Sequence, residues 1–135
     1  MRRCLIYFWA SPASAVGLMA GLAGLATGGR WTVVRGVLEV HGGFVTWFLR
    51  GGIPWFGSAA AMTLGHVIIG RDVECLERSR DHEHVHVRQY ERWGPAFIPA
   101  YLAASGWCWL RGYDAYFDNP FEREAYAEDE RRNRI

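Results

Sequence analysis

The N-terminal segment of the chain is almost free of charge, and this feature restricts its fold more than any other. No charged residue occurs from Cys4 to Gly29, while Arg2 and Arg3 precede this run and Arg30 follows it. About twenty apolar residues suffice to cross a bilayer as a helix. The run therefore predicts a helix that is either inserted in a membrane or buried in a core.

Three interpretations of this segment compete. A cleaved signal peptide would suit the Arg-Arg start, but the run is long for one and contains no convincing small-x-small cleavage pattern. A helix in a soluble core is disfavoured by Pro12 and by five glycines. We therefore expect an uncleaved membrane anchor over residues 1–29, whose small residues suit close packing of helices in lipid. The arginines on both sides of the run leave its orientation open.

Charges are divided unevenly between the two halves of the chain. Residues 1–70 hold five arginines and a single acid, Glu39, whereas the other thirteen acids follow position 70. With 135 residues there is room for one domain with a modest core, which we assign to residues 30–135. The net charge is +1 and there is no basic run, so we expect no binding of nucleic acid. The cysteines match no metal-binding or disulfide pattern and are expected to be unreactive thiols: Cys4, Cys75 and Cys108.

Three apolar segments separated by glycine-containing turns occupy the middle of the chain. They extend over residues 31–40, 44–49 and 60–70, and β-branched residues are frequent in the first and the third. Each segment is interpreted as a strand, because its composition and its flanking turns are typical of one. Together they predict a small antiparallel sheet, and with the helices expected on either side an α+β fold.

The motif HExxH appears in residues 82–86, which read His-Glu-His-Val-His. On a helix, positions i and i+4 share one face, so His82 and His86 can direct ring nitrogens at one zinc ion. Glu83 lies beside them, in position to accept a proton from a metal-bound water. The pattern therefore predicts a zinc site with its own general base.

Helix signals surround the motif. No Gly or Pro interrupts residues 79–92, Ser79 and Asp81 are candidate N-caps, and Gly94 followed by Pro95 ends the stretch. His84 falls about 160° around such a helix from the metal-binding face, so it is expected to point away. The simpler alternative is a polar surface helix that is rich in histidine without binding a metal.

Two histidines do not complete a catalytic zinc site, so a third protein ligand is expected. Asn119 and Pro120 predict the start of a C-terminal helix whose first turns carry acids. A carboxylate on that helix is the candidate ligand. The apolar, Trp-rich segment 96–110 lies between the two helices, and a bilayer crossing there would separate the acids from the motif. We therefore expect this segment to be a buried or membrane-skimming helix.

The sequence Phe121-Glu122-Arg123-Glu124-Ala125 matches part of a known third-ligand pattern, and through it the chain resembles the gluzincin branch of HExxH zinc metallopeptidases. The pattern Thr63-x-Gly65-x-x-Ile68, followed by H-E-x-x-H-V-x-Q, also resembles a bacterial family of short peptidase-like domains. The resemblance covers roughly residues 60–127. It implies Zn²⁺ as cofactor, Glu122 as third ligand, and a peptide or protein as substrate held by strand addition to the sheet. Glu124 stays open as the alternative third ligand.

One position departs from the gluzincin pattern. The Asp that usually follows the third ligand by four residues, and that orients a metal-bound histidine, is Tyr126 here. Loss of such a carboxylate weakens metal affinity about ten- to a hundred-fold, unless Asp118 or Asp129 replaces it. Several side chains are candidates for contacts with the substrate or for stabilising the oxyanion: His66, Tyr90, Tyr113 and Tyr126.

These expectations combine into one hypothesis. An apolar transmembrane helix precedes the sheet, the HExxH helix, the apolar helix and the helix that carries the third ligand. The protein would be a zinc-dependent peptidase that contacts lipid through residues 1–29, and a bacterial inner membrane is the expected location. One alternative is a non-catalytic membrane protein with a structural zinc site or a degenerate peptidase fold, in which His84 or Glu124 takes the place of the water. Another is a small membrane protein without a metal.

Overall fold

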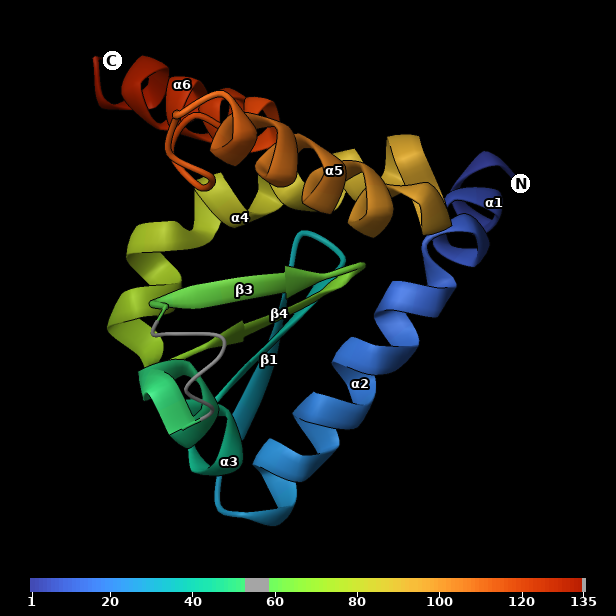
Figure 1. Cartoon of the computed structure of the whole chain (residues 1–135). Coiled ribbons are helices and arrows are strands. Elements are labelled where there is room, and N and C mark those ends of the chain that lie inside the picture. Colours follow the sequence, from blue (N-terminus) through green and yellow to red (C-terminus); the bar gives the residue numbers. More distant parts are fainter. Residues whose placement is uncertain (53–58, 135) are drawn as a thin grey trace.

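The computed structural model describes residues 1–52 and 59–134 and has a mixed α+β architecture (Figure 1). A four-stranded sheet lies between two layers of helix. On one face, Val40, Val67 and Ile69 pack with the helix α3, Gly43–Trp47, and with α2, Ser11–Ala26. On the other face, Val37 and Ile68 pack against the long helix α4. The expected α+β class is confirmed.

The sheet is mixed rather than antiparallel, so that part of the prediction was wrong. Its strands are β1 (Arg30–Val34), β2 (Val37–His41), β3 (Ala61–Leu64) and β4 (Val67–Gly70), in the order β1-β2-β4-β3. The pairs β1–β2 and β3–β4 are antiparallel hairpins, whereas β2 and β4 pair in parallel. Parallel pairing requires a crossover connection, which the chain between β2 and β3 supplies.

Two segments expected as single strands are hairpins. The first reverses at Arg35 and Gly36, which both have positive φ (54° and 78°), as the turns of two-residue hairpins often require. The second reverses at Gly65, whose φ is 64°. Arg-Gly and Gly-His are weak turn signals beside Asn-Gly, which explains why these turns were missed. His41 ends β2, and His66 lies in the second turn rather than on a strand.

Residues 44–49, predicted as a strand, form α3 and the start of a π-helical turn over Phe48–Gly52. The backbone N–H of Phe44 donates to Thr27 Oγ1 at 2.7 Å, which fixes the first turn. Val45 and Leu49, four residues apart, are both buried in the core beside the sheet. The burial of one helical face therefore outweighs the strand preference of a short apolar run.

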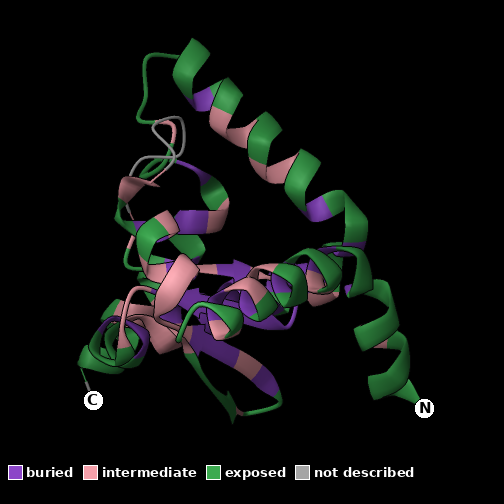
Figure 2. Ribbon diagram, turned by 90° about the horizontal axis from the view of Figure 1, so that it is seen from below, coloured by how far each residue is buried: buried purple, intermediate pink, exposed green. Residues whose placement is uncertain are grey.

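The uncharged N-terminal run forms two helices, α1 (Arg2–Trp9) and α2, bent by 67° relative to each other. Among the described residues no single helix has the length and apolarity needed to cross a bilayer, and α1 with α2 meets that test only as a bent pair. The glycine face of α2 packs closely on the sheet: a Cβ added to Gly17 would lie 2.7 Å from Cβ of Val67. The opposite side of α2 is exposed (Figure 2). The boundary between an anchor and a domain at residue 29 stays a prediction.

The motif helix α4 extends over Val73–Trp93 and begins earlier than expected. Its N-cap is Asp72, whose Oδ1 accepts from the backbone N–H of Cys75 at 2.7 Å, so neither Ser79 nor Asp81 caps it. The additional turns bury Leu76 against β4 and Val87. This packing explains why α4 starts at Val73, before the polar stretch from which its start was predicted.

A 3₁₀ turn over Gly94–Ala96 leads into α5 (Phe97–Leu110), and α6 (Pro120–Asn133) follows a loop. Asn119 caps α6 as predicted, accepting from the backbone N–H of Phe121. Burial of α5 was predicted as one alternative, and it is wrong: most of its side chains are exposed, whereas Phe97 and Cys108 are buried. The three cysteines are free, as expected.

Candidate metal centre

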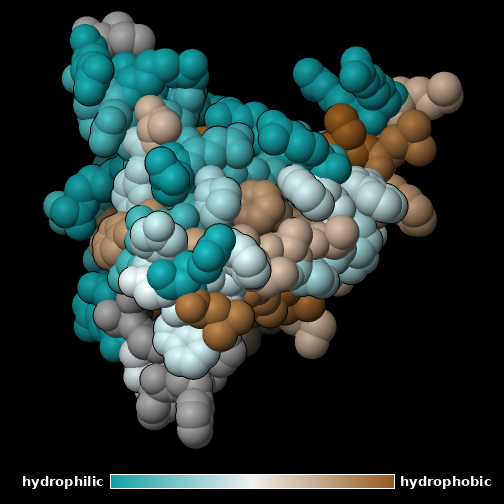
Figure 3. All heavy atoms as spheres, turned by 45° about the horizontal axis from the view of Figure 1, so that its top comes forward, coloured by the Kyte–Doolittle hydropathy of each residue, from teal (hydrophilic) through white to brown (hydrophobic). Residues whose placement is uncertain are grey.

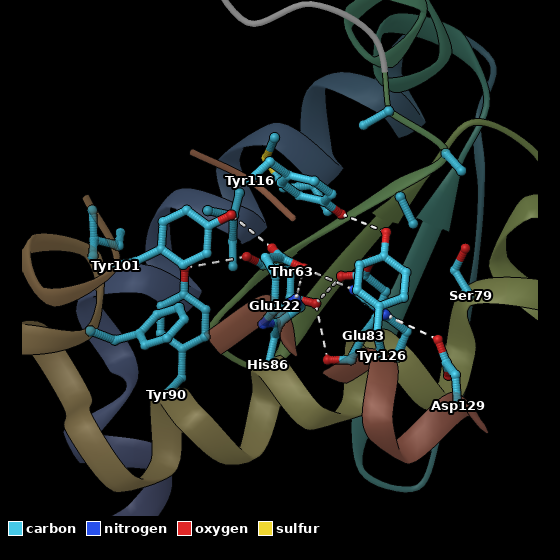
Figure 4. A pocket seen from close by; sticks show the side chains of 18 of the residues that line it. Thr63, Ser79, Glu83, His86, Tyr90, Tyr101, Tyr116, Glu122, Tyr126 and Asp129 are labelled. Carbon is cyan, nitrogen blue, oxygen red and sulfur yellow. Dashed lines mark hydrogen bonds and ion pairs between the residues drawn. The ribbon is translucent and has the colours of Figure 1, made fainter. Parts of the chain in front are cut away.

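His82, His86 and Glu122 converge at the place where α4 packs against α6. One potential ligand atom from each lies within 4.8 Å of the others, and all three side chains are buried. Oε2 of Glu122 lies 3.1 Å from Nε2 of His82 and 3.3 Å from Nε2 of His86 (Figure 4). The structure thus brings together the three residues that were predicted as ligands.

The ring nitrogen that faces away from Glu122, Nδ1, contacts a hydrogen-bond acceptor in both His82 and His86. Nδ1 of His82 lies 3.1 Å from Oδ2 of Asp129, and Nδ1 of His86 lies 2.8 Å from Oε1 of Gln89. Because both oxygens are acceptors, each Nδ1 carries a proton, and Nε2 is the ring nitrogen that faces Glu122. Without a metal, a proton on Nε2 can be donated to Glu122; once that proton is lost, the lone pair of Nε2 is free to bind a cation held between the three side chains. Two imidazoles and a carboxylate are also a donor set that fits a divalent transition metal.

The contacts between Glu122 and the two histidines also shift the pKa values of all three side chains. Burial lowers the pKa of His86, but its hydrogen bond to Glu122 and the charge of Glu83 outweigh burial and raise it to about 8. The pKa of His82 is raised by the same two carboxyl groups despite burial. Burial raises the pKa of Glu122, but the hydrogen bonds from His82 and His86 dominate and lower it to about 2. The centre attracts positive charge.

Tyr101 on α5 fixes the second oxygen of Glu122. Its hydroxyl donates to Oε1 of Glu122 at 2.7 Å, so Oε2 is left to face the histidines. Burial and this bond raise the pKa of the Tyr101 hydroxyl, which keeps it a donor. A carboxylate held in this way is oriented to offer one oxygen to a metal. The sequence carried no signal for Tyr101, because α5 reads as uniformly apolar.

Glu83 lies next to the ligands and is 7% exposed. The hydroxyl of Thr63 on β3 donates to Oε2 of Glu83 at 2.6 Å. Burial raises the pKa of Glu83, although His86, Thr63 and His82 each act in the opposite direction. A buried carboxylate with a raised pKa is a stronger base than an exposed one. Thr63 was recognised as part of a motif, but its contact with Glu83 was not foreseen.

A cavity of about 750 Å³ lies beside the centre, and the three ligands, Glu83 and Asp129 all line it. Tyr90 and Tyr126 line it as well. The Tyr90 hydroxyl donates to the carbonyl of Thr63 at 3.2 Å, and the Tyr126 ring lies edge-on to the ring of His82.

His66 is not among the described residues that line this cavity. Its ring stacks on Tyr7, with 4.0 Å between ring centroids, and its Nε2 lies 2.9 Å from Oε1 of Glu91. These contacts join the turn between β3 and β4 to α1 and α4. Tyr113 lies exposed in the loop between α5 and α6.

The alternative ligands lie elsewhere. His84 is buried on another side of α4, and burial, followed by the charge of Arg35, lowers its pKa. Glu124 is exposed and accepts from Nε2 of Gln89. Of the two acids considered as substitutes for the missing carboxylate, Asp118 accepts from the backbone of its own loop, whereas Asp129 contacts His82.

Comparison of the chain with protein-family models, with curated proteins and with solved structures gives no match.

Proposed function

We propose that this protein is a zinc-dependent peptidase of the gluzincin type, associated with a bacterial inner membrane through its N-terminal helices. The observation that carries the proposal is the buried group of His82, His86 and Glu122, with Glu83 facing the same cavity. In the described part of the chain this group has three protein ligands. A catalytic zinc site uses three, whereas a structural site uses four.

The residues around the cavity suit hydrolysis of a peptide bond. Zinc, when held by the three ligands, would act as Lewis acid toward the substrate carbonyl and lower the pKa of a water. Glu83 would accept the proton of that attacking water and then deliver it to the leaving amine. Thr63 holds one carboxylate oxygen of Glu83, so the orientation of the base is fixed while its other oxygen takes the proton.

The proposed membrane association is supported by the N-terminal helices. α1 exposes Leu5 and Phe8, and α2 exposes Met19 and Leu22 on the side away from the sheet. Apolar side chains beside strongly polar ones are visible at the end of the molecule where α1 lies (Figure 3). In the described structure no ion pair involves the arginines at positions 2 and 3. An apolar face flanked by unpaired cations suits a bilayer that contains anionic lipid.

The rival function is a zinc site that only holds α4 and α6 together, in a degenerate peptidase fold. Both functions predict that the metal binds, but only the peptidase requires Glu83. The positions of His84 and Glu124 outside the ligand group favour the peptidase, because these two side chains were the candidates for closing the site.

Metal analysis of purified protein tests the proposal. The wild type, Glu83→Gln and His86→Ala would be purified without chelator, loaded with zinc and assayed on a mixed peptide library. We expect one zinc in the wild type and in Glu83→Gln, with hydrolysis abolished in the latter, and loss of zinc in His86→Ala. His84→Ala is the matched control, because it removes a histidine of the same helix and should keep both zinc and activity. A wild type without zinc, or Glu83→Gln with full activity, would overturn the proposal.

A further inference from the structure

The cavity beside the metal centre has two chemically different ends. Figure 4 shows Ser79 and Asp129 on one side of the ligands and Tyr90 and Tyr101 on the other. Arg78, the neighbour of Ser79 on α4, also lines the cavity, as do the small residues 59–61 that lead into β3. Tyr101 shares α5 with three apolar lining residues, Phe97, Ile98 and Leu102, and Leu64 at the other end of β3 lines the cavity as well.

The edge strand β3 runs between these ends, with Ala61 toward the first and Leu64 toward the second. It is the outer strand of the sheet, so its free backbone groups can pair with an extended peptide. Leu64 pairs with Val67 across the two-residue turn, and the N–H of Arg71 donates to the carbonyl of Ala60. In an antiparallel ladder this register leaves the backbone groups of Ala61 and Thr63 on the free edge.

The direction of a bound peptide follows from this edge. Antiparallel pairing is slightly more stable than parallel pairing for each residue. A peptide antiparallel to β3 would place its N-terminal half beside Leu64 and α5, and its C-terminal half beside Ala61 and Arg78. The carbonyl of Thr63 is already bound by the Tyr90 hydroxyl, so on this strand the backbone of Ala61 offers both a donor and an acceptor.

We propose that the site selects peptides with large apolar side chains on the N-terminal side of the scissile bond. This inference rests on the proposed function and names its substrate class. No charged residue occurs in α5, and Ile98 and Leu102 are 43% and 62% exposed, so both are available to cover an apolar side chain of a substrate. The opposite end suits small side chains, because residues 59–61 line it, and its charges are Arg78, which has no ion-pair partner among the described residues, and Asp129.

The test uses two quenched fluorogenic peptides of identical composition, Ala-Leu-Leu-Ala-Glu-Ala and its reversed sequence, with zinc-loaded wild type. We expect at least tenfold higher kcat/KM for the first peptide, with mass spectrometry placing the cut after a leucine. Equal or reversed preference would refute the inference and leave the peptidase intact. Cleavage of neither peptide, together with no activity on the library, would refute the peptidase and the inference with it.

Variants of α5 test the side chains themselves. Leu102→Ser should lower kcat/KM for the first peptide about tenfold, mainly through KM, because it removes most of one apolar contact. Leu110→Ser is the matched control, since Leu110 is 73% exposed on the same helix and does not line the cavity. Both variants should keep the zinc content and the circular dichroism of the wild type. Equal effects of the two variants would contradict the assignment of α5 to the substrate.

Discussion

Asp129 should control the affinity of the metal centre without binding the metal. Its Oδ2 accepts from Nδ1 of His82 at 3.1 Å, which fixes both the tautomer and the ring orientation of that ligand. Asp129→Ala removes this acceptor, and Asp129→Asn keeps an acceptor but removes the charge. Neither change touches His86 or Glu122, so the ligand set itself is preserved.

The size of the effect follows from the geometry. Loss of a group that orients a metal-bound histidine lowers affinity about ten- to a hundred-fold, which corresponds to about 1.4 to 2.7 kcal/mol. The Asp129 side chain is 29% exposed, so water replaces part of its contribution. We therefore expect about tenfold weaker zinc binding for Asp129→Ala and a few-fold weaker binding for Asp129→Asn.

Competition with a chromophoric chelator at pH 7.5 measures both values. Glu130→Ala is the matched control, because Glu130 is the next acid on α6, is exposed, and should leave affinity unchanged. Thermal unfolding in the presence of chelator separates loss of affinity from loss of fold. If Asp129→Ala binds zinc within twofold of the wild type, Asp129 does not support His82 and does not replace the carboxylate that Tyr126 displaces.

Two further predictions concern stability. Folding raises the pKa of His86 from 6.5 to about 8, so protonated His86 stabilises the fold by about 2 kcal/mol below pH 6.5, and this contribution is lost as pH rises through 8. The Tm of metal-free protein should therefore fall over this pH range, and zinc should restore it. A Tm that does not change over this range would contradict the coupling between His86 and Glu122. Arg80→Ala should destabilise the fold by about 3–5 kcal/mol, because Glu39 is 1% exposed and both its oxygens accept from Arg80. Arg35→Ala, which breaks an exposed ion pair, should cost about 1 kcal/mol or less in urea unfolding, and equal losses would show that Glu39 is not buried as described.

The parts of the site that depend on local spacing could be predicted from the sequence. The i, i+4 relation of His82 and His86 brings them to one face of any helix that contains them. Gln89, three residues after His86, lies on that face as well and accepts from it. Tyr101 and Thr63 could not be assigned, because their contacts depend on how α5 and β3 pack against the helices, which no local pattern specifies.

The sheet shows where local patterns were insufficient. Residues 31–40 and 60–70 have the composition of strands, and this was correct. The chain reverses at Arg35 and at Gly65 because these residues adopt positive φ. The dipeptide Asn-Gly is a strong sequence signal for such a turn, whereas Arg-Gly and Gly-His are weak ones. The parallel pairing of β2 with β4 depends on a crossover through a segment whose short helix α3 resembles a strand in composition.

The departure at Tyr126 has a geometric resolution. On an α-helix, residues four and seven positions after Glu122 both lie within about 40° of its direction, separated by about 4.5 Å along the axis. Tyr126 takes the nearer position and packs its ring edge-on against His82, while Asp129 takes the farther one and accepts from the same ring. The carboxylate is therefore shifted by one turn of α6 rather than lost. We expect the centre to bind a metal with the affinity of a site in which a carboxylate orients the histidine.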